Sequence, residues 1–309
     1  MAPDAADNFR RDYGAAQETV QKGVSAGRAV ASNTAWKQWL MFADELGIDP
    51  FLQAFKDKVP FLQIFAHRIR SGELAPKGNP IRARPTEDYV RLVAQTFMHV
   101  GTDDPRLNTA GDIDFRLSRI ISAWKKEDPP PNRVKPVPIQ VIRRIAFLAQ
   151  STADQHYIAI ADMIIIGFFF LLRPGEYTDS SSESTPFRLV DVQLFIGQTR
   201  LNILEAPIQQ LQQAQFATLE FTDQKNGVRG EIIGLGRSGD PYLCPVLSII
   251  RRVLYLRSNN AHPHSPLARV MNTPSRVTAA SITKVLRDCV TYLGADLGFL
   301  PSDVYARSR

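Results

Sequence analysis

An arginine stands where a long apolar helix is expected to end. Residues 163–172 are apolar, and Arg173-Pro174-Gly175-Glu176 follows at once. A helix that is apolar all round is a core helix or a membrane span, and Asp162 and the short length favour a core helix. Pro174-Gly175 is a stop signal, so Arg173 is expected in the last turn or just beyond it, where helix carbonyls favour a cation. The arginine therefore either caps the helix or offers a guanidinium to an anion.

A lysine is predicted at the tip of a β-hairpin. Residues 216–222 alternate as a strand, Asn226-Gly227 is a turn signal, and residues 228–235 return as the second strand. Lys225 then lies at the tip of this hairpin. Lysines in surface turns are common, so in isolation a solvated side chain is the favoured interpretation.

A basic run lies near the middle of the first half of the chain. Its central members are Lys77, Arg82 and Arg84, and Arg68 and Arg70 precede it. A solvated charged face is the usual meaning of such a run. The alternative is a surface that neutralises backbone phosphates and releases counterions.

Three other motifs do not support chemistry. Residues 234–239 match the glycine pattern of dinucleotide sites, but Asp240-Pro241-Tyr242 stands where that site needs a helix N-terminus. His262-Pro263-His264 lacks carboxylate or cysteine companions, so no metal site is expected there. Cys244 and Cys289 have no paired spacing, and we interpret them as reduced, buried thiols. Neither a cofactor nor a metal is expected.

The elements that must position these residues follow from apolar periodicity. Residues 1–23 lack a sustained apolar face and are predicted to be a flexible tail or a frayed helix. Four helices are expected next, centred on residues 36–46, 61–69, 90–100 and 115–124, and they form a small helical domain over residues 24–127. The proline-rich residues 128–138, which include Arg133 and Lys135, form a semi-rigid linker that could itself lie against a polyanion.

The second predicted domain covers residues 139–309. A helix at 139–150 precedes the apolar helix, and short strands are expected at 187–196 and 200–204, followed by the hairpin. Helices at 245–257 and 278–293 complete it. The expected fold is mainly α with a small antiparallel β-sheet.

Composition sets wide limits on function. The chain has 309 residues, 44% of them hydrophobic, and its Lys and Arg outnumber Asp and Glu by 37 to 31. This mild basic excess is compatible with a polyanionic partner but does not prove one. No secretory signal and no membrane span are expected, so the prediction is a nuclear or cytoplasmic protein.

The order of these features resembles the tyrosine recombinases, also called phage integrases. The resemblance begins near residue 25 and is most specific in FFFLLRPGEYT (168–178), FTDQKNGVRGEIIGLGRSGDPYLCP (221–245) and LGFLPSDVYARS (297–308), which look like the recombinase-like proteins of eukaryotic mobile elements. The resemblance implies a core-binding domain and a catalytic domain that clamp double-stranded DNA, site-specific DNA recombination or integration through a 3′-phosphotyrosine, self-association on DNA, and nuclear residence.

The resemblance also implies roles for particular residues. Arg173 corresponds to the first catalytic arginine, whose guanidinium can hold two phosphate oxygens. Lys225 corresponds to the hairpin lysine, a general acid for the departing 5′ oxygen. Glu176 is expected to hold nearby backbone or arginine groups rather than react. The implied DNA-contacting residues are Arg68, Arg70, Lys77, Arg82, Arg84, Arg133 and Lys135.

The chain departs from the family pattern at its end. The family next requires a His-x-x-Arg box, a further His or Trp and the nucleophilic Tyr, and none of these follows Arg173 within residues 1–309. Arg307 or Arg309 could begin the box. His67 and Arg70 have its spacing but precede Arg173, and neither Tyr177 nor Tyr305 occupies the nucleophile's place. We therefore expect a C-terminally truncated recombinase-like protein that binds DNA without cleaving it. The alternatives are a non-catalytic DNA-binding or structural protein derived from a mobile element, and a protein-interaction module without nucleic acid.

Overall fold

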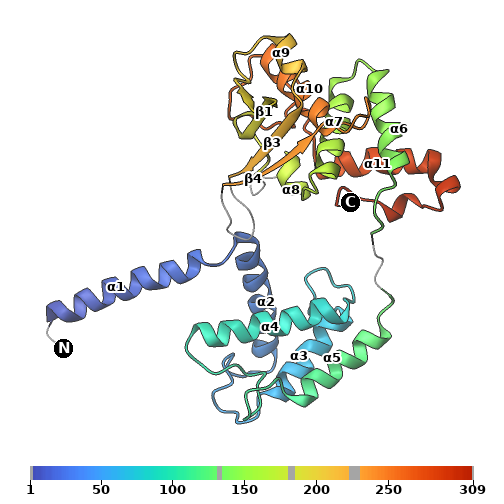
Figure 1. The fold of residues 1–309 in the computed structure, drawn as a ribbon. Helices are drawn as coiled ribbons and strands as arrows, with labels where there is room; N and C mark the ends of the chain where they lie inside the picture. The colour runs from blue at the N-terminus through green and yellow to red at the C-terminus, as the bar shows by residue number, and fades with distance from the viewer. Residues whose placement is uncertain (1–2, 131–133, 180–184, 223–229, 308–309) are drawn as a thin grey trace. The chain divides into compact units, whose positions relative to one another are not determined.

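The computed structural model describes residues 3–130, 134–179, 185–222 and 230–307 (Figure 1). The chain divides into two compact units, Met1–Pro131 and Asn132–Arg309, so the division falls within the proline-rich segment. Each unit has its own hydrophobic core. The two units are therefore described separately.

The first unit begins with a long helix, α1 (Pro3–Lys22), where the sequence predicted either a flexible tail or a frayed helix. Its Phe9 and Tyr13 rings stack with their centroids 6.0 Å apart, and both side chains are more than half exposed. The expectation of a tail rested on the missing apolar face. The helix forms with a narrow stripe, Phe9, Tyr13 and Val20, that stays largely in solvent.

Four further helices build the core of the first unit: α2 (Ala26–Glu45), α3 (Val59–Ser71), α4 (Ala83–His99) and α5 (Phe115–Glu127). Their apolar faces meet around a cluster of aromatic rings, because aromatic side chains bury large areas and pack edge to face. Trp39 lies against Phe42, Phe65 and Phe97, at centroid distances of 5.2 to 6.1 Å. The Trp39 indole N–H donates to the Pro50 carbonyl at 2.8 Å, so this buried polar group is satisfied.

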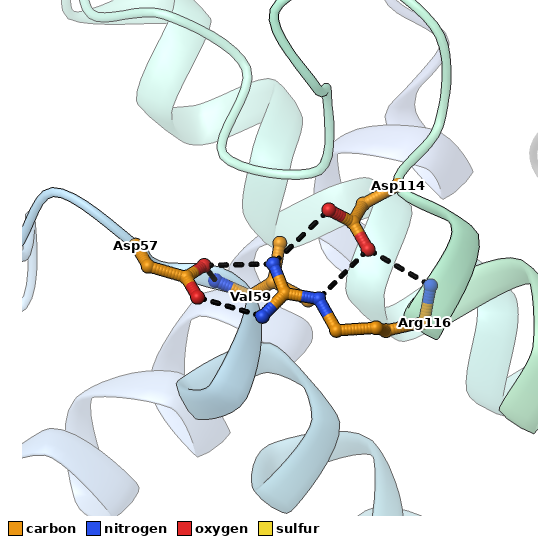
Figure 2. A network of polar contacts seen from close by, with 4 residues as sticks. All are labelled: Asp57, Val59, Asp114 and Arg116. Carbon is orange, nitrogen blue, oxygen red and sulfur yellow. Dashed lines mark hydrogen bonds and ion pairs between the residues drawn. The ribbon is translucent and has the colours of Figure 1, made fainter.

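An arginine joins the start of α5 to the loop before α3. Figure 2 shows the Arg116 guanidinium between Asp57 and Asp114, with the Asp57 carboxylate accepting at 2.6 and 2.9 Å. Asp114 also accepts from the Arg116 amide at 2.8 Å and so caps α5. The Arg116 hydrogen bonds lower the pKa of both carboxyl groups. This arginine is exposed but its charge is neutralised.

In the second unit a central helix, α7 (Gln155–Phe169), is surrounded by three others. They are α6 (Ile139–Gln150), α10 (Pro245–Ser258) and α11 (Ala279–Leu297), and all three contact α7. Residues 159–167 are all buried, including Asp162, so the apolar run is a core helix. No helix among the described residues is long and apolar enough to cross a membrane.

Asp162 is a buried carboxylate inside this helical core, 2% exposed. Its Oδ1 accepts from Nε and Nη2 of Arg251 on α10, at 2.8 and 2.5 Å, while Oδ2 has no hydrogen-bond partner. Burial raises the pKa of Asp162, and the Arg251 guanidinium offsets part of that effect.

Both cysteines are buried and form no disulfide, and burial raises the pKa of Cys289 to about 11. The Cys289 thiol is therefore held in the protonated, unreactive form.

A small antiparallel sheet completes the second unit, which confirms the predicted fold class: mainly α with a small antiparallel β-sheet. The strands are β1 (Val192–Ile196), β2 (Thr199–Leu201), β3 (Phe216–Phe221) and β4 (Glu231–Gly236), in the order β2-β1-β3-β4. The strand predicted over 187–196 is shorter, because a 3₁₀ turn, η1 (Leu189–Asp191), occupies its first half. The sequence did not predict the short helix α9 (Ile208–Gln212).

Candidate functional site

Arg173 does not cap the apolar helix, contrary to one interpretation of the sequence. Helix α7 ends at Phe169, and Leu171 takes a positive φ of 54°, which breaks the helical path. Arg173 is instead the residue before a one-turn helix, α8 (Pro174–Tyr177). Proline at the first helical position suits this start, because it has no N–H to satisfy. The guanidinium therefore belongs to a separate turn, 173–178, and not to the carbonyl end of α7.

Glu176 fixes the backbone of this turn. Its Oε2 accepts a hydrogen bond from the Arg173 amide at 2.6 Å, and its Oε1 lies 3.4 Å from Nη1 of Arg173. The Glu176 side chain is only 14% exposed, whereas that of Arg173 is 52% exposed. The carboxylate is thus committed to the turn, and the guanidinium remains accessible to a solvent-borne anion.

Tyr177 attaches the 173–178 turn to the core of the second unit. Its ring lies against Gly167 of α7, where an added Cβ would come within 3.0 to 3.1 Å of three ring carbons. Its hydroxyl donates to the Ala306 carbonyl at 2.6 Å, and the side chain is buried. This contact could not be predicted from the sequence, because 129 residues separate the two partners. Tyr177 therefore holds the 173–178 turn against both α7 and the C-terminal segment.

The hairpin base lies beside the same turn. The Phe187 amide donates to the Glu176 carbonyl at 2.9 Å, and the Phe187 ring packs on Phe221 at 4.9 Å between centroids. Phe221 is the last residue of β3 and pairs with Glu231, the first residue of β4. Lys225 lies outside the described residues, so the structure gives the position of the hairpin base but not of the lysine.

The C-terminal segment brings further arginines to this region. Arg287 of α11 and Arg307 both lie over the Tyr305 ring, at 4.3 and 5.5 Å from its centroid. Arg287 also donates to the Val304 carbonyl at 3.3 Å, and the Ala306 amide donates to Thr283 Oγ1 at 3.0 Å. These bonds hold residues 304–307 against α11. Arg307 is exposed and follows Ala306, whose carbonyl accepts the hydrogen bond from the Tyr177 hydroxyl.

Two of the predicted DNA-binding arginines have structural partners in the first unit. Arg68 pairs with Glu45 at 2.7 Å, and Arg70 pairs with Asp128 at 2.8 Å and donates to the Ile81 carbonyl. Their side chains are only 20% and 19% exposed. Both guanidinium groups also lie over aromatic rings, those of Phe42 and Trp124. Arg68 and Arg70 therefore stabilise the bundle, and their charges are largely compensated.

The other three predicted DNA-binding residues of the first unit are exposed to solvent. Lys77, Arg82 and Arg84 are exposed, and among the described residues they have no ion-pair partner. They lie between α3 and the start of α4. Asp128 fixes this junction, since its Oδ2 accepts from the Ala83 amide at 2.7 Å and its Oδ1 from Arg70. Burial alone would raise the pKa of Asp128, but these two hydrogen bonds bring it below its usual value.

Of the two predicted DNA-binding residues in the linker, Lys135 has a structural partner. Lys135 donates to Asp303 Oδ2 at 2.8 Å, and its amide donates to the Asp303 carbonyl at 2.9 Å. The Leu300 amide and the Lys135 ammonium lower the pKa of Asp303. Lys135 therefore ties the start of the second unit to the 3₁₀ turn η2 (Pro301–Asp303). Arg133 lies outside the described residues.

Comparison with known proteins does not assign a family to the chain. No protein-family model matches the chain, and no curated protein matches its sequence. In the part of the chain that the structure describes, no group of three His, Cys, Asp or Glu side chains could hold a metal ion. The candidate site therefore consists of the 173–178 turn, the neighbouring hairpin base and the arginines of the C-terminal segment.

Proposed function

We propose that the chain is a DNA-binding protein of the tyrosine-recombinase type in which Arg173 contacts a backbone phosphate. The observation that carries the proposal is the 173–178 turn, which is fixed by Glu176 and Tyr177 but leaves the guanidinium exposed. A guanidinium held at a fixed place can give two parallel hydrogen bonds to one phosphate. Pre-organisation of this kind reduces the entropy lost on binding.

The surroundings of the turn support the same proposal. The base of the β3–β4 hairpin packs beside Glu176 through Phe187, and the family resemblance assigns the general-acid role to Lys225, which follows β3 in the chain. Arg307 adds an exposed positive charge next to Ala306, whose carbonyl accepts the Tyr177 hydrogen bond. A phosphodiester at Arg173 would then lie near the C-terminal segment that carries Arg307.

The first unit supplies a second expected DNA contact. Lys77, Arg82 and Arg84 are exposed and unpaired among the described residues, which favours contacts with phosphate over a role in the bundle. Contacts of this type position a protein on duplex DNA without reading its sequence. Self-association on DNA and nuclear residence belong to the proposal, and they follow from the family resemblance alone.

Binding without cleavage is the expected outcome for this chain. Residues 1–309 contain no His-x-x-Arg box after Arg173, and Tyr177 is buried with its hydroxyl bonded to Ala306. A buried phenol with this bond cannot attack a phosphodiester. Incubation with duplex DNA should give no detergent-resistant protein–DNA adduct, and an adduct would refute the expectation.

Arg173→Ala tests the phosphate contact, and Arg143→Ala is its matched control. Arg143 is equally exposed, in the same unit, and pairs with Asp240 at 2.8 Å. Arg173→Ala should weaken duplex binding about tenfold, since hydrogen bonds to charged groups are strong. Arg143→Ala should leave it unchanged. Equal losses for the two variants, or no loss for either, would remove Arg173 from the binding site.

One observation favours a second candidate, a protein-interaction role. The Phe9, Tyr13 and Val20 side chains of α1 form an exposed apolar stripe on a helix of 20 residues. Most of the stability of a helix in a protein comes from packing of its apolar face, so a partner that covers this stripe would stabilise α1. A chain that fails to bind duplex DNA at low salt but binds a protein through α1 would favour this alternative.

A further inference from the structure

The outer face of the sheet carries two aromatic rings on its central strands. Side chains alternate between faces along a strand, and Val192, Leu194, Ala217 and Leu219 point into the core of the second unit. The opposite face is partly open, since Phe216 is 40% exposed and Phe195 is partly exposed, although Thr218 on the same face is buried. Gly234 and Gly236 on the same face are exposed as well. This face lies outside the candidate site of the 173–178 turn.

Four residues form a single row across this face. The register pairs Arg200 with Phe195, Phe195 with Phe216, and Phe216 with Gly236. Residues directly opposite one another in an antiparallel sheet share a face, and neighbouring strands lie about 5 Å apart. The row therefore contains a cation, two rings and a glycine in that order, across all four strands.

The Phe216 ring lies beside Gly234 of the neighbouring strand. An added Cβ at Gly234 would come within 2.6 Å of two carbons of this ring, so the glycine leaves the space that the ring fills. The Phe195 ring meets it at 6.3 Å between centroids, with an angle of 66° between the rings. Phe216 is 40% exposed and Phe195 is partly exposed, so both rings are accessible from solvent. An exposed aromatic ring is a surface on which an unpaired base can stack.

The charged residue of the row is positive, and the nearest carboxylate on this strand face is distant. Arg200 is exposed and has no partner among the described residues, so it can contact a phosphate. The carboxylate on this face, Glu220, lies four residues along β3 from Phe216, or about 13 Å at the usual rise per residue. That distance exceeds the screening length of about 8 to 10 Å at ordinary salt. The row itself contains no acidic residue.

We propose that this row binds single-stranded nucleic acid, with unpaired bases stacked on Phe216 and Phe195 and a phosphate at Arg200. Aromatic side chains on an antiparallel sheet stack bases in this way in other nucleic-acid-binding proteins. Paired bases in a duplex are stacked on each other and cannot offer their faces to the rings. The site therefore selects single strands, and it is independent of the duplex contact at Arg173.

Fluorescence anisotropy of the full chain with a labelled oligothymidylate of about 20 nucleotides tests the proposal. Phe195→Ala and Phe216→Ala should each weaken binding about tenfold, and Arg200→Ala should reduce its salt dependence. Phe115→Ala is the control, because Phe115 is an exposed phenylalanine of the first unit. Single-strand binding within twofold of the unsubstituted chain in the Phe195→Ala/Phe216→Ala double variant would overturn the proposal.

Two further measurements separate this site from the duplex site and from misfolding. Arg173→Ala should weaken duplex binding but leave oligothymidylate binding unchanged, so failure of one proposal does not imply failure of the other. Phe216→Trp keeps an aromatic ring and should retain binding, and its fluorescence should be quenched by oligothymidylate. Heparin supplies negative charge without bases and should cause no such quenching. Equal quenching by heparin, or none by oligothymidylate, would overturn base stacking.

Discussion

The Glu176 carboxylate accepts a hydrogen bond from the Arg173 amide and lies 3.4 Å from the Arg173 guanidinium. One side chain thus fixes the turn and also lowers the net positive charge of the site. Glu176→Gln keeps an acceptor oxygen for the amide but removes the negative charge, so it should strengthen duplex binding a few-fold. Glu176→Ala loses the acceptor and should weaken it. Anisotropy titrations with duplex DNA check both, and equal effects of the two variants would contradict this division of roles.

Gly167→Ala should destabilise the second unit. The new Cβ would meet the Tyr177 ring at 3.0 to 3.1 Å, and overpacking of this kind costs about 1 to 3 kcal/mol. Displacement of Tyr177 should also weaken duplex binding, because the ring supports the Arg173 turn. Gly175→Ala is the control, since nothing lies within 4 Å of its Cβ position. Urea unfolding followed by circular dichroism measures the difference, and similar stabilities of the two variants would exclude this role of Gly167.

Combined alanine substitution of Lys77, Arg82 and Arg84 should reduce the salt dependence of duplex binding. Each lost phosphate contact lowers the slope of log K against log salt by about 0.9, so three contacts give a change of nearly 3. Lys56→Ala is the control, because Lys56 is exposed at the opposite end of α3. An unchanged slope in the triple variant would remove this loop from the DNA-binding face.

Thr218→Val should stabilise the second unit or leave its stability unchanged. The Thr218 hydroxyl is buried without a hydrogen-bond partner, and an unsatisfied buried polar group costs about 1 to 3 kcal/mol. Thr178→Val should have the opposite effect, because the Thr178 hydroxyl donates to the Pro174 carbonyl at 2.6 Å. Thermal unfolding of both variants tests the contrast. A loss of stability in Thr218→Val would show that this hydroxyl has a partner in solution.

Arg251→Met should destabilise the second unit in a pH-dependent way. The Asp162 carboxylate is 2% exposed while the Arg251 side chain is 40% exposed, so loss of Arg251 leaves a buried carboxylate without its cation and lowers the stability at neutral pH. The pKa of Asp162 is already raised by burial, and loss of Arg251 raises it further. The folded variant then binds a proton more tightly than the unfolded chain does, so its deficit should shrink as the pH falls. A deficit that is independent of pH would contradict this.

Apolar periodicity accounts for most of the observed helices. The patterns at residues 36–46, 61–69 and 139–150 predict α2, α3 and α6, because each apolar stripe has to face a core. The Asn226-Gly227 signal predicts a hairpin whose base is present as β3 and β4. For residues 1–23 the sequence left a flexible tail and a frayed helix open, because the apolar stripe of α1 is too narrow to distinguish the two.

The side-chain partners could not be predicted in the same way. Arg68 and Arg70 read as part of a basic surface, but Glu45 and Asp128, which compensate them, are distant in sequence. The end of α7 was misplaced because the positive φ of Leu171 has no sequence signal in a leucine. Only the folded chain shows which cations are already paired.

The paired bonds between Lys135 and Asp303 have a mechanical consequence. The chain enters the second unit at residues 134–138, and its first firm attachment is to the turn that precedes Arg307. A pull on the proline-rich segment would therefore load this turn first, and through Ala306 it would reach the Tyr177 hydroxyl. Tension in the connecting segment is transmitted to the support of Arg173 through three hydrogen bonds and a few residues of backbone.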